Sequence, residues 1–198
     1  MATTSIKSIF LSASVPLPDR DAKYIETADI IAIRDAVIAL AMVVLPSHRI
    51  IWGGHPSITP LLYYVMKKLN LNIQENLKLY QSLFFKDIFP EDNDRFHNII
   101  LTENSGDIHS SIQLMRNRML SENTFAAAVF IGGMDGIEVE YKMFREKHPE
   151  ALVLPIASTG AATQIVYENL LPDKFKNERL VKDYGYMSLF QKLLIDKI

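Results

Sequence analysis

The stretch FIGGMDGIEVEY, residues 130–141, holds the residues best suited to chemistry. An apolar run ends at Gly132 and Gly133, and Glu138 and Glu140 follow in the first turns of an expected helix. Backbone N–H groups of such a loop can approach an anion, because glycine has no side chain to block it. Glu140 could alternatively hold a ribose hydroxyl or stabilise a developing sugar cation. A plain strand-to-helix turn is the third interpretation, since the helix dipole alone favours acids there.

Three other apolar runs also end in small or polar residues, as SASVP (12–16), GGHPS (53–57) and ASTGAA (157–162). The carboxyl ends of parallel strands meet at one sheet edge, where α/β proteins bind ligands. Ser57 and Thr159 would serve equally well as helix N-caps. Trp52 is expected in the core. The expected ligand contacts are Ser12, Ser14, Gly53, Gly54, His55, Arg116, Gly132, Gly133, Asp135, Gly136, Ser158 and Thr159.

Arg116 and Arg118 lie in SIQLMRNRMLSEN, whose Ile112, Met115 and Met119 mark a buried helix stripe. One arginine could point to solvent while the other reaches the sheet edge and makes a bidentate contact with a phosphate through two guanidinium nitrogens. If the site is catalytic, Glu140 or Glu138 would act at the anomeric carbon of a sugar. Arg116 would then hold the phosphate or steer the leaving base.

The elements that must position these residues alternate between short apolar runs and amphipathic stretches. Several of the runs are continuously apolar, which favours strands buried on both faces of a parallel sheet. The order predicts a three-layer Rossmann-like α/β fold with a mostly parallel sheet and helices on both faces, in a single domain over 1–198. Strands are expected at 8–13, 49–54, 77–82, 98–103, 126–133 and 152–158, and helices at 27–45, 57–70, 108–122, 136–147, 159–171 and 186–196. The irregular segments 14–26 and 84–97 are candidate functional loops, or ordinary surface loops.

The amino-acid composition excludes some classes of function and argues against others. Hydrophobic residues make up 48% and charged residues 22%, as in ordinary globular proteins. A formal charge of −2 argues against duplex nucleic acid as the main partner. The lack of cysteine excludes disulfides, zinc–thiolate sites and thiol catalysis, and the five histidines have no metal-ligand spacing. No metal or cofactor is expected. The longest apolar run is too short to span a bilayer, so we expect a cytoplasmic protein without a membrane partner.

Residues 111–141 resemble the lonely-guy phosphoribohydrolases and the wider SLOG superfamily of Rossmann-like nucleotide-binding domains. Those proteins have an arginine in a helix, then a buried strand, then a glycine loop GGxGTxxE that opens the next helix. Here Arg116 is followed by NRMLSENTFAAAVFI, Gly132 and Gly133, and the motif's glutamate would be Glu140 if the loop is one residue longer. IFLSASVP and WGGHPSITPLL also fit the family. The motif's Gly-Thr is replaced by Asp135, Gly136 and Ile137, which puts a carboxylate into the anion loop.

The resemblance implies a domain that binds a nucleotide-derived small molecule, such as an ADP-ribose-type or cyclic nucleotide signal. The chain is more similar to the sensor-type members, some associated with antiphage defence, than to the hydrolases. A sensor would act through homo-oligomerisation or an effector protein. The alternative is an N-glycosidic enzyme, either a phosphoribohydrolase or a protein like the nucleoside deoxyribosyltransferases. A third reading is an interaction protein with a vestigial site, in which FFKDIFPEDNDRF docks a partner.

Overall fold

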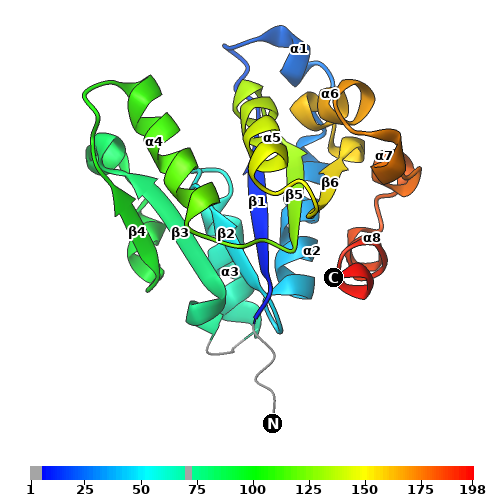
Figure 1. Ribbon diagram of the computed structural model, residues 1–198, viewed down its shortest axis with the longest axis horizontal. Helices are drawn as coiled ribbons and strands as arrows, with labels where there is room; N and C mark the ends of the chain where they lie inside the picture. Colours follow the sequence, from blue (N-terminus) through cyan, green and yellow to red (C-terminus); the bar gives the residue numbers. More distant parts are fainter. Residues whose placement is uncertain (1–5, 70–72) are drawn as a thin grey trace.

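A computed structural model describes residues 6–69 and 73–198. Six parallel strands form one sheet with the order β4-β3-β2-β1-β5-β6 (Figure 1). The strands are β1 (Ser8–Ser14), β2 (Arg49–Trp52), β3 (Leu77–Ser82), β4 (Ile99–Thr102), β5 (Ala127–Gly132) and β6 (Leu152–Ile156). The chain proceeds outward from β1 to β4 and then returns to the other side of β1, so the strand order reverses between β1 and β5.

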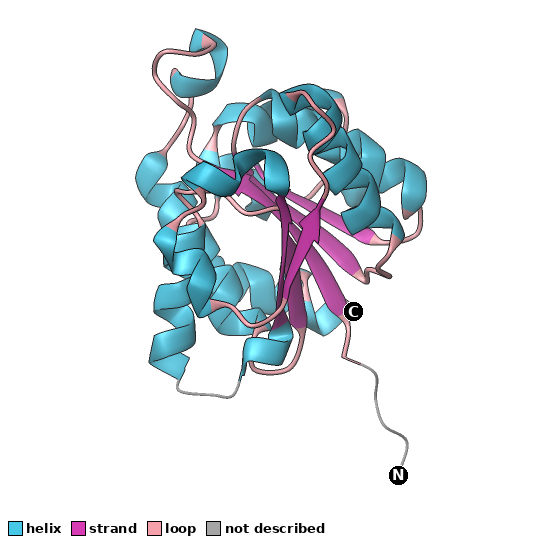
Figure 2. Cartoon of the chain, turned by 90° about the vertical axis from the view of Figure 1, so that its left-hand side faces the viewer, coloured by secondary structure: helices cyan, strands magenta, loops and turns pink. Residues whose placement is uncertain are grey.

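Helices cover both faces of this sheet, as the side view in Figure 2 shows. One face packs against α2 (Ile30–Val44), α3 (Thr59–Leu69) and α8 (Tyr186–Leu193). The other packs against α4 (Ile108–Ser121), α5 (Asp135–Lys147) and α6 (Ala161–Asn169). Short helices lie in the connections: α1 (Ala22–Ile25), α7 (Arg179–Lys182), and the 3-10 turns η2 (Leu83–Ile88) and η3 (Glu91–Arg95). These layers confirm the predicted three-layer α/β fold.

The strand residues alternate between two apolar cores, one on each face of the sheet. Ile9 and Leu11 belong to the core under α2 and α3, whereas Phe10 belongs to the core under α4 and α5. On the second face Phe10 stacks on Phe144 of α5 at 5.6 Å between ring centroids. Burial on both faces explains why these strands are continuously apolar in the sequence.

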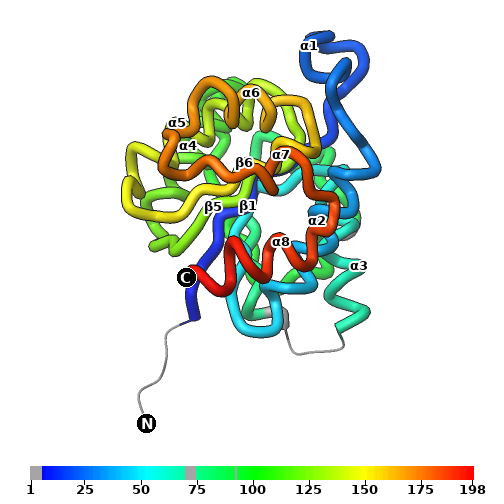
Figure 3. Tube along the Cα trace, turned by 90° about the vertical axis from the view of Figure 1, so that its right-hand side faces the viewer, coloured from blue at the N-terminus to red at the C-terminus, as the bar shows by residue number. Residues whose placement is uncertain are grey.

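Every predicted strand and helix is present, with shifted ends. β2 ends at Trp52 instead of residue 54, because Gly54 has a φ of +70° that turns the chain away from the sheet. α6 begins at Ala161 rather than 159, after a 3-10 turn, Ala157–Thr159. The predicted last helix, 186–196, ends at Leu193, and α8 lies against α2 at the edge of the molecule (Figure 3). The expected irregular segments contain α1, η2 and η3.

Candidate functional site

A cavity of about 530 Å³ opens at the carboxyl ends of β1, β2 and β3. Its walls come from the β1 and β2 termini, from η2, from α4 and from the first turns of α5. The cavity lies beside the reversal of strand order, where open α/β sheets bind their ligands. Its volume falls within the range of about 300–1,000 Å³ that is usual for small-molecule sites.

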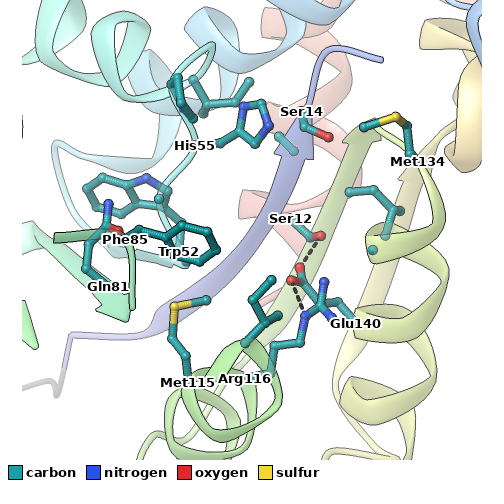
Figure 4. Close-up of a pocket in the computed structure, with 18 of the residues that line it drawn as sticks. Ser12, Ser14, Trp52, His55, Gln81, Phe85, Met115, Arg116, Met134 and Glu140 are labelled. Carbon is teal, nitrogen blue, oxygen red and sulfur yellow. Dashed lines mark hydrogen bonds and ion pairs between the residues drawn. The ribbon is translucent and has the colours of Figure 1, made fainter. Parts of the chain in front are cut away.

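Three polar side chains meet on one wall of the cavity (Figure 4). Ser12 Oγ donates a hydrogen bond to Glu140 Oε2 at 2.5 Å, and Arg116 Nε donates to Glu140 Oε1 at 2.9 Å. The side chains of Arg116 and Glu140 are 17% and 16% exposed. Glu140 therefore faces the cavity as a paired carboxylate, which settles which of the two glutamates points inward.

The elements explain why these three residues meet. Asp107 caps α4 by accepting from Ser110 N at 2.9 Å, and this fixes the helix that carries Arg116 across from the end of β1. Gly136 in α5 leaves the space that Arg116 occupies. A Cβ on Gly136 would lie 2.8 Å from Arg116 Nη2.

Glu138 and Arg118, the other members of the two candidate pairs, point elsewhere. Glu138 Oε1 accepts from Tyr24 Oη at 2.7 Å, which joins α5 to α1. Arg118 Nε donates to Glu122 at 2.7 Å on the outer side of α4. These interactions hold the fold together. Of the two candidate glutamates and the two candidate arginines, Glu140 and Arg116 are therefore the ones that line the cavity.

His55 lines the cavity in the loop after β2. Its Nδ1 lies 2.8 Å from Ser57 Oγ, and that hydroxyl accepts from Val15 N at 3.3 Å, which ties the β2 loop to the β1 loop. Burial lowers the pKa of His55 below its ordinary 6.5, and the charge of Glu140 partly opposes this shift. The imidazole is therefore neutral at pH 7 and can offer Nε2 to a ligand.

The opposite wall of the cavity is apolar and aromatic, with one amide. Trp52, Phe85 and Gln81 lie together there in Figure 4, across from the Ser12–Glu140 pair. Further apolar contacts come from Ile58, Ile88, Phe89, Ile108, Ile112 and Met115. Trp52 is 2% exposed, as expected of a core residue, yet it also forms part of this wall. Gln81 and Phe85 were not among the predicted contacts, because neither follows a glycine or small-residue junction.

The glycines at the end of β5 shape the turn rather than the cavity wall. Gly132 and Gly133 have φ of +61° and +75°, a conformation that favours glycine. Gly132 N donates to Thr159 Oγ1 at 3.0 Å, and Gly133 N donates to Ser14 O at 2.8 Å. Both N–H groups therefore have protein partners, and neither glycine lines the cavity, so their role as ligand contacts stays a prediction.

Ser158 and Thr159 lie away from this cavity. Ser158 Oγ donates to Asp183 O at 3.1 Å and lies 3.1 Å from Tyr186 Oη, while Thr159 Oγ1 donates to Ile156 O at 2.6 Å. They follow β6, the outermost strand, which β5 separates from β1. The structure therefore brings eight of the twelve predicted contacts to the cavity, together with the candidate catalytic Glu140, and leaves Gly132, Gly133, Ser158 and Thr159 out. The eight are Ser12, Ser14, Gly53, Gly54, His55, Arg116, Asp135 and Gly136.

The charged side chains around the cavity balance one another. Arg20 and Arg116 are opposed by Asp135 and Glu140. Within residues 6–69 and 73–198, no cluster of three or more histidine or acidic side chains could hold a metal ion. Nor is any helix in this described part both long and apolar enough to cross a bilayer.

The fold and the site define a Rossmann-like α/β domain with a ligand-sized cavity at the switch in strand order. The model of the SLOG cluster3 family matches residues 23–194, and the chain belongs to this family. The match confirms the resemblance to the SLOG superfamily and extends from α1 to α8, so it includes the cavity residues from Trp52 onward in the sequence. No curated protein matches the chain.

Proposed function

We propose that the chain binds a nucleotide-derived small molecule, of ADP-ribose type or a cyclic nucleotide, in the cavity at the carboxyl edge of the sheet. The observation that carries this proposal is the division of the cavity into an aromatic wall and a hydrogen-bonding wall. A nucleoside has the same division, with a flat apolar base on one side and a hydroxyl-rich sugar on the other. Membership of a SLOG family adds support.

The polar wall suits a ribose and a phosphate. The hydroxyls of Ser12 and Ser14, the ring of His55 and the guanidinium of Arg116 all line this part of the cavity. Met134, the N-cap residue of α5, makes no side-chain capping bond, which leaves the positive end of a helix of 13 residues without a side-chain partner at the cavity. Asp135 at this end is exposed, so it can stay hydrated when an anion binds.

A thermal-shift panel tests the proposal. The panel contains nucleoside mono- and diphosphates, NAD, ADP-ribose, its cyclic isomers and cyclic oligonucleotides. A ligand at about 100 times its Kd should stabilise the folded chain by roughly 2.7 kcal/mol. The control is Gly53→Leu at a cavity-lining position without a positive φ, where the new Cβ would lie 3.1 Å from Met115 Cε; this variant should lose the shift. If no compound shifts the wild-type melting temperature, the proposal fails and the docking role of the 84–97 segment becomes the better account.

A second candidate is N-glycosidic cleavage, and the position of Glu140 favours it. A carboxylate that faces the cavity could stabilise the sugar cation while water adds at the anomeric carbon and the base departs. Arg116 lies 2.9 Å from that carboxylate and could hold a phosphate with its remaining nitrogens. Glu140→Gln should keep ligand binding and lose turnover. Chromatography of the incubated ligand decides between the two functions, because a sensor returns its ligand intact.

A sensor would also need a way to pass on its signal. Homo-oligomerisation, an effector protein and a role in antiphage defence stay predictions. Size-exclusion chromatography with light scattering, with and without the ligand that gives the largest thermal shift, tests the first of them. A mass that is the same in both states and equals one chain would contradict oligomerisation as the output.

A further inference from the structure

Gln81 near the end of β3 is a mostly buried polar side chain at the cavity wall. It is 7% exposed and lines the cavity. Its backbone carbonyl accepts from Thr102 Oγ1, but its carboxamide has no hydrogen-bond partner within residues 6–69 and 73–198. Among the described residues, the fully buried polar atoms without a partner do not include the Gln81 amide, so its donor and acceptor stay accessible from the cavity.

The surroundings of Gln81 hold its amide toward the cavity. Gly54 lies directly against it, since a Cβ at Gly54 would come within 2.3 Å of Gln81 Nε2 and 2.9 Å of Leu79 Cδ1. Gly54 also has a φ of +70°, which another residue would adopt only under strain. The loop after β2 therefore provides the space in which the carboxamide lies.

The walls next to Gln81 are flat and apolar. Trp52 and Phe85 lie beside it in Figure 4, and Met115 of α4 also borders the cavity. Phe85 is held in η2, whose first turn is capped by Ser82 Oγ accepting from Phe84 N at 3.2 Å. Aromatic faces with one amide between them are the arrangement by which proteins bind an unstacked base, with the rings on its face and the amide on its edge.

We infer that this end of the cavity binds the adenine of the ligand, and that the Gln81 carboxamide reads its edge. A carboxamide presents one acceptor and one donor side by side. Adenine presents the complementary pair, the 6-amino group and N7, so two parallel hydrogen bonds form. On that edge guanine presents two acceptors, O6 and N7, so neither orientation of the amide forms both hydrogen bonds. The inference deepens the proposed function and rests on it.

Three variants test the inference: Gln81→Met removes both hydrogen bonds at similar size, Gln81→Glu replaces the donor by an acceptor, and Gln113→Met is the matched control. Gln113 is also a partly buried glutamine, but it contacts Met143 Sδ at 3.7 Å and lies outside the cavity. Calorimetry measures Kd for AMP, GMP and the monophosphate of purine riboside, which lacks the 6-amino group. Circular dichroism checks that each variant is folded.

Wild-type protein should prefer AMP to GMP and to the purine riboside nucleotide by about 10-fold or more. Gln81→Met should remove this preference, and Gln113→Met should keep it. Gln81→Glu should weaken AMP binding, because a carboxylate can accept from the 6-amino group but cannot donate to N7. Equal Kd values for AMP and GMP in wild-type protein would overturn the inference, as would an unchanged preference in folded Gln81→Met. Failure of all three nucleotides and of the wider panel would instead overturn the proposed function.

Discussion

Arg116 and Glu140 form an ion pair that water reaches only in part, with side chains 17% and 16% exposed. Arg116→Met would leave the carboxylate in a poorly solvated place with Ser12 as its remaining partner. We expect a loss of about 1–3 kcal/mol in the free energy of unfolding, measured by urea denaturation at pH 7. Glu140→Gln in the same protein should recover part of that loss.

The control for this prediction is Arg118→Met, which breaks a more exposed pair with Glu122 on the same helix. Exposed pairs contribute about 0–1 kcal/mol, so the two arginines should differ clearly. Equal losses at both positions would show that the Arg116–Glu140 pair is no better shielded from water than a surface pair.

His55 gives the stability of the protein a pH dependence. Its folded pKa lies below 6.5, because burial disfavours the charged ring more than Glu140 favours it. Below about pH 6.5 the unfolded chain therefore binds more protons than the folded chain at this residue, and stability falls as the pH falls. We expect His55→Gln to flatten this decline between about pH 7 and 5. Urea midpoints against pH measure it, and parallel curves would refute it.

The burial of His48 also lowers its pKa, and His48 is present in both proteins of that comparison. Its contribution therefore cancels. The remaining difference between the two pH profiles belongs to the cavity histidine.

At the scale of elements, the start of α5 sets the position of Arg116. Gly136→Ala adds a methyl group 2.8 Å from Arg116 Nη2 at a position without a strained φ. Because alanine favours helix more than glycine does, we expect a smaller loss of stability than in Arg116→Met. The displaced guanidinium should weaken nucleotide binding by about 10-fold, the value of one charge-assisted hydrogen bond.

Calorimetry with the nucleotide that gives the largest thermal shift measures this prediction. Gly106→Ala is the control, since a Cβ there would meet nothing within 4 Å and Gly106 does not line the cavity. It should lose some stability because Gly106 has a φ of +93°, and it should keep its affinity. Full affinity in Gly136→Ala would mean that Arg116 does not contact the ligand.

Hydrophobic pattern and junction chemistry were enough to predict all six strands and the main helices. They also predicted Ser12, Gly54 and His55, because β1 and β2 end in small or polar residues and these strands are neighbours. Sequence could not give the order of the strands. Ser158 follows a strand with the same kind of junction, but β6 lies at the far edge of the sheet, so this serine bonds Asp183 instead of facing the cavity.

Gln81 is a cavity residue that sequence analysis missed. The signal for it was an amide near the end of the strand LKLYQS, with two phenylalanines three and four residues later. That pattern acquires meaning only when Gly54, distant in sequence, is seen to lie against the amide. The Ser12–Glu140 contact joins residues 128 positions apart, and no local pattern predicts such a pair.

For the molecule as a whole, a single sheet supplies one side of each of the two cores. We therefore predict that the chain unfolds as one cooperative unit, which also tests the single-domain prediction. Trp52 is the only tryptophan, so its fluorescence reports on the cavity while far-ultraviolet circular dichroism reports on all helices. Urea transitions followed by the two signals should have the same midpoint. Separate midpoints would indicate two units.

The position of β1 at the centre of the sheet has a consequence for how the protein is made. On one edge β1 pairs with β2, with Ile9 opposite Ile50. Its other edge pairs with β5, with Ile9 opposite Ala127, and β5 comes much later in the sequence. A nascent chain that has not reached β5 exposes that edge and lacks the α5 wall of the cavity, so ligand cannot assist the early steps. Contacts this distant in sequence slow folding, and we expect refolding on the order of milliseconds to seconds in stopped-flow fluorescence. Refolding within microseconds would show that the central pairing does not limit the rate.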